Sequence, residues 1–166
     1  MFAARRNNIQ HLYRRELGRF DIVQVEGTEG GYYPEFSPDG QSVAFLTTGG
    51  VVKRVPVSGG APVVLLDAAG TGLSNLSWSG DRLRYSSRGE QREGVWEIPA
   101  SGGERRSLTT PDASRQEVAH RFPQSLPGGD ALLFTAIYSR PPDADGNDDV
   151  VVQRLSSGER RVLTKG

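Results

Sequence analysis

The repeat unit of this chain is clearest in Tyr32-Tyr33-Pro34-Glu35-Phe36-Ser37-Pro38-Asp39-Gly40-Gln41-Ser42-Val43-Ala44-Phe45-Leu46. Strand-like residues 32–36 and 42–46 flank a tight turn, Ser37–Gly40, whose proline fixes its own φ and whose glycine accepts a positive φ. Two more strand-like runs, each after a glycine-containing turn, complete the unit: Val51–Val57 and Val63–Leu66. The stretch therefore predicts four short antiparallel strands.

The same order of strands and turns occurs twice more downstream. Ser58-Gly59-Gly60 returns as Ser101-Gly102-Gly103, 43 positions later. The third unit is longer, and its excess falls on Arg140–Asp149, an insertion between its second and third strands. A four-stranded repeat of about 40–45 residues is typical of β-propeller blades, which bury their faces only by stacking on one another around an axis.

The segment before the first unit predicts an incomplete blade. Ile9–Leu17 fits neither a helical nor a strand period cleanly, and we favour a strand because the run ends at Gly18 and precedes the β-rich run Phe20–Val25. The prediction is an all-β propeller with three full four-stranded blades and one partial blade of three strands, which lacks its innermost strand. The boundaries are 1–31 for the partial blade, then 32–70, 71–113 and 114–166 for the full blades, the last with the insertion at 140–149.

An incomplete ring leaves exposed edges and bare blade faces, which proteins normally avoid. Three arrangements would cover them: a compact four-bladed ring, two copies that complete a ring of about eight blades, or a place within a longer propeller. We favour the second arrangement, a homodimer formed through the open blade faces.

Composition and charge exclude several classes of partner and chemistry. Lysine and arginine total 20, as do aspartate and glutamate, so a nucleic-acid-binding or anionic-membrane-binding surface is not expected. The chain contains no cysteine, which rules out disulfides, thiolate metal sites and a cysteine nucleophile. No apolar run approaches the ~18 residues of a membrane helix, and residues 1–8 do not resemble a secretion signal. A cytoplasmic location is expected.

Several motifs together resemble the TolB-type, WD-like propeller repeat. They include Gly27-Thr28-Glu29-Gly30 followed by residues 34–45, and later Val57-Ser58-Gly59-Gly60-Ala61-Pro62, Trp96-Glu97-Ile98-Pro99-Ala100-Ser101-Gly102-Gly103, His120-Arg121-Phe122-Pro123-Gln124 and Gly158-Glu159-Arg160-Arg161-Val162-Leu163. The resemblance spans nearly the whole chain and extends to the propeller regions behind the kinase domain of bacterial serine/threonine kinases. It implies an interaction or sensing module with no agreed catalytic residues to transfer, and no kinase motif is present here.

The insertion carries the best candidate metal site. Asp143, Asp145, Asn147 and Asp149 place oxygen ligands at alternate positions, as a calcium ion could use. The glycine falls earlier than in an EF-hand loop, and no glutamate closes the pattern. A solvated acidic loop is the alternative interpretation, because Asp, Asn and Gly are also ordinary turn residues.

Candidate catalytic residues are few. The two histidines are His11 and His120, and no Gly-x-Ser-x-Gly motif occurs. His120 beside Arg121 could line the axial channel or serve as a hydrogen-bonded structural histidine. The recurring aromatics Phe36, Trp78, Trp96, Phe122 and Phe134 are predicted to pack between blades. No catalytic or cofactor-binding residue is assigned.

The resulting functional hypothesis is a non-catalytic propeller that presents a binding surface to a protein or a small ligand. The first alternative is a detached sensor or interaction domain of a larger signalling protein, such as a serine/threonine kinase. The second is a hydrolase or lyase with its site in the axial channel.

Overall fold

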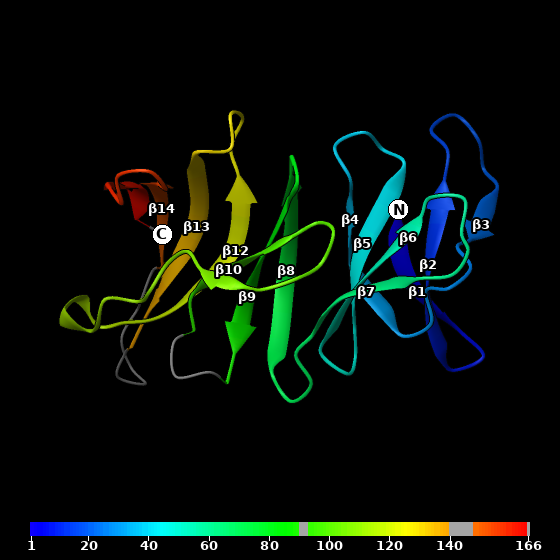
Figure 1. Cartoon of the computed structure of the whole chain (residues 1–166), viewed down its shortest axis with the longest axis horizontal. Helices are drawn as coiled ribbons and strands as arrows, with labels where there is room; N and C mark the ends of the chain where they lie inside the picture. The colour runs from blue at the N-terminus through cyan, green and yellow to red at the C-terminus, as the bar shows by residue number, and fades with distance from the viewer. Residues whose placement is uncertain (90–92, 140–147, 166) are drawn as a thin grey trace.

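A computed structural model of the chain describes residues 1–89, 93–139 and 148–165, and strands account for most of them (Figure 1). The first sheet has three strands: β1 (Phe2–Arg6), β2 (Ile9–Arg15) and β3 (Ile22–Gln24). The second has four: β4 (Gly31–Phe36), β5 (Ser42–Thr47), β6 (Val51–Pro56) and β7 (Val63–Asp67). The third contains β8 (Gly72–Ser79), β9 (Arg82–Arg88), β10 (Val95–Pro99) and β11 (Arg106–Ser107). After a 3₁₀ turn, η1 (Ala113–Arg115), the fourth contains β12 (Glu117–Ser125), β13 (Ala131–Tyr138), β14 (Asp149–Arg154) and β15 (Arg160–Lys165).

Each sheet is an antiparallel meander, and the sheets follow one another across the molecule in chain order (Figure 1). The predicted all-β architecture of three full blades and one three-stranded blade is thus confirmed. The strand interpretation of Ile9–Leu17 is also confirmed for most of its length, since β2 covers Ile9–Arg15. In the described ranges, no helix has the length and apolar character needed to cross a membrane.

The turn between β4 and β5 forms as its residues predict. The Gly40 N–H donates to the Ser37 carbonyl at 2.8 Å, and Gly40 has a φ of +69°. The Ser37 hydroxyl accepts the Ser42 N–H at 2.9 Å, which ties the start of β5 to the turn.

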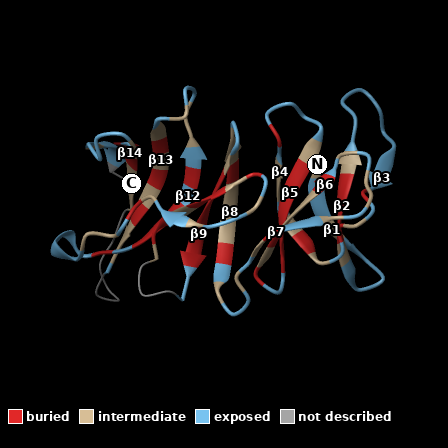
Figure 2. Cartoon of the chain, in the orientation of Figure 1, coloured by how far each residue is buried: buried red, intermediate tan, exposed pale blue. Residues whose placement is uncertain are grey.

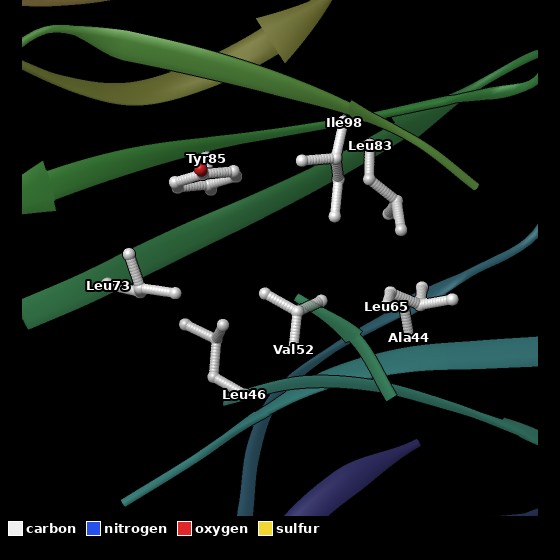
Figure 3. Close-up of a cluster of buried hydrophobic side chains, with 8 residues drawn as sticks. All are labelled: Ala44, Leu46, Val52, Leu65, Leu73, Leu83, Tyr85 and Ile98. Atoms are coloured by element: carbon white, nitrogen blue, oxygen red, sulfur yellow. The ribbon is translucent and has the colours of Figure 1, made fainter. Parts of the chain in front are cut away.

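The hydrophobic core lies between sheets, so buried residues appear on the strands where neighbouring sheets face each other (Figure 2). The junction of the first and second sheets is formed by Leu12, Val25, Val43, Phe45 and Val55. The junction of the second and third contains Ala44, Leu46, Val52 and Leu65 against Leu73, Leu83, Tyr85 and Ile98 (Figure 3). The junction of the third and fourth contains Val95, Leu132, Phe134, Ala136 and Val151. Because each fully buried large apolar side chain contributes about 1.5–3 kcal/mol, stacking of blades is the main source of stability.

Candidate functional site

The first strands of the three full blades share an unusual backbone feature. In β4, β8 and β12 the pairing register shifts at a corresponding point, as in a β-bulge: between Tyr32 and Glu35, between Ser74 and Ser77, and between Arg121 and Gln124. β12 has a second shift, between Glu117 and Ala119. At each of the three corresponding shifts a residue other than glycine has a left-handed backbone: Tyr33 (φ 49°), Asn75 (φ 57°) and Phe122 (φ 53°). Such a conformation costs about 1–3 kcal/mol, so its recurrence at one blade position marks a functional candidate.

These three residues border two hollows. The larger, which we call the axial hollow, has a volume of about 560 Å³ and is lined by residues of β4, β8 and β12. The second hollow, about 410 Å³, is lined by the same three strands and by Met1 and Phe2. Tyr33, Asn75 and Phe122 line both hollows. The three bulged strands therefore border the same two hollows.

The axial hollow also contains charged groups with fixed partners. Arg121 donates to the Ser87 carbonyl at 2.9 Å and forms an ion pair with Glu93, and Arg88 lines the same wall. Burial would raise the pKa of Glu93, but hydrogen bonds from the Gly89 N–H and Arg121, together with the nearby arginine charges, lower it overall. The wall thus holds an ionised carboxylate beside two guanidinium groups.

The second hollow has a different electrostatic character. Burial raises the pKa of Glu35, against the opposing effect of a backbone hydrogen bond from Trp78. The exposed fraction is 62% for Phe122 and 47% for Tyr33, so their rings are available for contact rather than buried in a core. In the second hollow this aromatic surface lies beside the Glu35 carboxyl, and in the axial hollow it lies beside Arg88 and Arg121, a combination that suits recognition of another molecule.

Comparison with solved structures shows which known fold the chain shares. The chain matches TolB from Acinetobacter baumannii with a TM-score of 0.74 and 16% identity, over 98% of this chain and 40% of that one. The chain has the TolB-like β-propeller fold. A TolB-like protein from Agrobacterium tumefaciens gives a TM-score of 0.71 and 16% identity, over 96% and 58% of the two chains.

A third similar structure is an oligogalacturonate lyase from Vibrio parahaemolyticus, with a TM-score of 0.65, 13% identity and coverage of 95% and 43%. At these identities the likeness concerns the fold. This TolB-like chain spans 40% to 58% of the length of these three proteins. No protein-family model and no curated protein sequence matches it.

Only one of the four predicted calcium ligands lies in the described part of the chain. Asp143, Asp145 and Asn147 lie outside the described residues. Asp149 is described and accepts a hydrogen bond from the Tyr138 hydroxyl at 2.9 Å. The pKa of Tyr138 is raised to about 12, mainly by burial and secondly by this hydrogen bond to Asp149. Within ranges 1–89, 93–139 and 148–165, no group of three or more His, Asp or Glu side chains is placed to hold a metal. The calcium site stays a prediction.

His120 is a buried residue of this chain and does not line either hollow. Its side chain is fully buried, with Nε2 3.0 Å from a Glu117 oxygen and Nδ1 2.7 Å from the Thr109 hydroxyl. Glu117 also accepts from Arg160 at 3.2 Å. Arg121, the next residue on β12, lines the axial hollow. Sequence reasoning considered His120 for this place and named Arg121 only as its neighbour.

The packing prediction for the recurring aromatics is partly wrong. Phe134 is buried, and Trp78 and Trp96 pack against the junction of the second and third sheets. Phe36 and Phe122, in contrast, are exposed. Phe122 occupies the left-handed bulge position of its strand, which points it away from the junction core.

Burial of His120 predicts a pH dependence of stability. Desolvation lowers the pKa of this histidine below its ordinary value of 6.5, against a hydrogen bond to Glu117 that raises it. The unfolded chain therefore takes up the proton first as the pH falls, and the free energy of unfolding is expected to decrease below about pH 6.5. The pKa of Glu117 is lowered from 4.5, so its own contribution is lost in a separate, more acidic window.

Urea denaturation between pH 8 and pH 5 measures this effect. The His120→Gln variant is expected to show a flatter pH profile than the wild type over that range. An identical slope in the two proteins would show that another group is responsible.

Proposed function

We propose that this chain is a non-catalytic binding module that recognises a partner molecule over the axial hollow. The observation that supports the proposal is a left-handed backbone that recurs at the same position of three blades, at Tyr33, Asn75 and Phe122. Two of these side chains are largely exposed, so packing of a core does not account for the conformation. Strain that recurs at one position and is not used for packing is typical of a ligand-contacting site.

The charged wall supports recognition of a polar partner. The guanidinium group of Arg121 is held by Ser87 and Glu93, so it keeps its position without a ligand. The Ser74 hydroxyl, on the same wall, is buried without a hydrogen-bond partner among the described residues. Tyrosine and arginine are enriched among the residues that dominate protein interfaces, which favours a protein partner.

A glycine substitution separates a binding role from a folding role. Phe122→Gly removes an exposed ring and relieves the left-handed strain, so the free energy of unfolding is expected to stay within about 1 kcal/mol of the wild type. Phe134→Ala, which removes a buried ring, is the comparison and should cost about 3–5 kcal/mol. Chemical denaturation measures both.

Binding is then tested with a phage-displayed random peptide library selected on the wild-type protein. Enriched peptides are expected to bind the Phe122→Gly variant at least about tenfold more weakly, which corresponds to about 1.4 kcal/mol. A Phe122→Gly variant that loses several kcal/mol of stability, or equal peptide binding by both proteins, would contradict the proposal.

The hydrolase or lyase alternative is tested by a substrate screen, in which absence of turnover would support the binding module. The predicted homodimer also belongs to the proposal. Apolar side chains are exposed on the first sheet at Phe2, Ile9 and Ile22, which provides surface for a second copy.

A further inference from the structure

Among the described residues, the wall of the axial hollow contains more positive than negative charge. Arg88, Arg121 and Glu93 all line it. Both carboxylate oxygens of Glu93 are already occupied, because Oε1 accepts from the Gly89 N–H at 3.2 Å and Oε2 pairs with Arg121. Arg88 lies near enough for its charge to lower the pKa of Glu93, yet within residues 1–89, 93–139 and 148–165 it forms no hydrogen bond or ion pair of its own. One guanidinium group of this wall therefore has donors to spare.

Gly72 gives Arg88 the space to reach the hollow. The two residues are cross-strand partners in β8 and β9, so their side-chain positions lie on the same face of the sheet. A Cβ atom at Gly72 would lie 3.1 Å from the Arg88 Cβ and 3.9 Å from its Cδ, whereas Cβ atoms of opposed residues are normally about 4.5–5.5 Å apart. The stem of Arg88 thus lies across Gly72, the first residue of a strand that borders the hollow.

A hydroxyl group adds a further donor to this wall. Ser74 follows Gly72 by two positions on β8, which places the two residues on the same face of the strand. Its side-chain oxygen is buried without a hydrogen-bond partner in the described part of the chain, and such a group costs free energy until an acceptor satisfies it. Arg88 and Ser74 therefore both offer donors where the wall lacks acceptors.

We propose that the axial hollow binds an acidic side chain of a partner protein, with Arg88 as the contacting group and Gly72 as the residue that positions Arg88. The two guanidinium groups and one carboxylate leave one positive charge, which a single carboxylate balances and a doubly charged phosphate exceeds. A planar guanidinium also donates two parallel hydrogen bonds to a carboxylate. The inference deepens the proposed function and rests on it for the use of this hollow as a binding site.

The rim of the hollow indicates what flanks the acidic residue. Tyr33, Val118 and Phe122 line the same hollow and are 47%, 46% and 62% exposed. Apolar side chains next to the carboxylate would cover this surface, so the expected segment carries an aspartate or glutamate between apolar residues.

The probes are two peptides, acetyl-Ala-Leu-Glu-Leu-Ala-amide and the same peptide with glutamine in place of glutamate. In an NMR titration of the ¹⁵N-labelled protein, the glutamate peptide is expected to shift the amide resonances of Gly72, Ser74 and Arg88 saturably. It should bind at least about tenfold more tightly than the glutamine peptide at low ionic strength, and salt should reduce the difference. Sodium acetate and inorganic phosphate, titrated separately, should each bind more weakly than the glutamate peptide.

Three variants locate the contact. Arg88→Gln should bind the two peptides equally, whereas Arg82→Gln, on the same strand but outside both hollows, should keep the tenfold preference. Gly72→Val retains Arg88 but fills the space that its stem occupies, so it should also lose the preference. Circular dichroism verifies that each variant is folded, and the Arg88→Gln and Arg82→Gln pair keeps the test decisive if Gly72→Val unfolds.

The proposal is overturned if the glutamate peptide causes no saturable shift, if both peptides bind the wild type equally, or if Arg88→Gln behaves like Arg82→Gln. Acetate or phosphate that binds at least as tightly as the glutamate peptide would assign the hollow to a small free anion and would also overturn it. Selected peptides without acidic residues that still depend on Phe122 would leave the proposed function standing while this inference fails, so the two failures are distinguishable.

Discussion

Replacing Glu97 with alanine is expected to lower the free energy of unfolding by about 3–5 kcal/mol. The Glu97 carboxylate accepts from Arg84 at 2.9 Å and from Arg106 at 2.8 Å, and the side chains of Glu97 and Arg84 are 1% and 5% exposed. Arg84 also donates to the Ser125 hydroxyl of β12 and to the Gly129 carbonyl in the turn after β12. Without Glu97 the Arg84 guanidinium would remain buried with its charge uncompensated, at the junction of two blades.

Two further variants check the cause. Arg106→Ala removes the exposed partner of Glu97, whose side chain is 68% exposed, and should cost no more than about 1 kcal/mol. The double variant Glu97→Ala/Arg84→Met removes the unpaired charge and should recover much of the loss. Urea denaturation compares the three proteins. A loss below about 1 kcal/mol for Glu97→Ala would mean that water reaches Arg84 and that the ion pair contributes little.

The substitution Gly27→Ala is expected to cost about 2–6 kcal/mol, through two effects that add. Gly27 has a φ of +78°, where a side chain costs about 1–3 kcal/mol. A Cβ atom there would also lie 2.1 Å from the Gly60 carbonyl oxygen and 3.1 Å from Pro62 Cδ. Relieving that overlap requires movement of the backbone, which adds about 1–3 kcal/mol.

Gly18→Ala is the matched control for this prediction. Gly18 has a similar φ of +85°, but no atom lies within 4 Å of the Cβ position. This variant should therefore show the backbone effect alone, about 1–3 kcal/mol. If thermal or chemical unfolding gives equal losses for the two variants, the close contact between Gly27 and the turn that contains Gly60 does not contribute to stability.

The blade pattern was predictable because its causes are local. Strand alternation and turns such as Ser37–Gly40 depend on residues adjacent in the chain, and repetition of the unit fixed the architecture. The ion pair of Arg84 with Glu97 was not predictable in the same way. The two residues are cross-strand partners in β9 and β10, so their contact follows only from the pairing register.

The candidate site was harder to predict because a local preference is overridden. Tyr33 and Phe122 both precede prolines, and a residue before proline normally has an extended backbone. Both instead have left-handed backbones at strand bulges, which turn the rings toward the hollows. The sequence pattern therefore grouped Phe122 with packing aromatics, although its surroundings in the folded chain are those of a surface residue.

The placement of the core between sheets, rather than within them, has a consequence for how the molecule opens. Each buried cluster joins one sheet to the next, so the chain behaves as a linear series of coupled units. A sheet in the middle is held by two junctions and a terminal sheet by one. Amide hydrogen exchange should accordingly be fastest in β1–β3 and β12–β15 and slowest in β5 and β9, as opening proceeds inward from both ends.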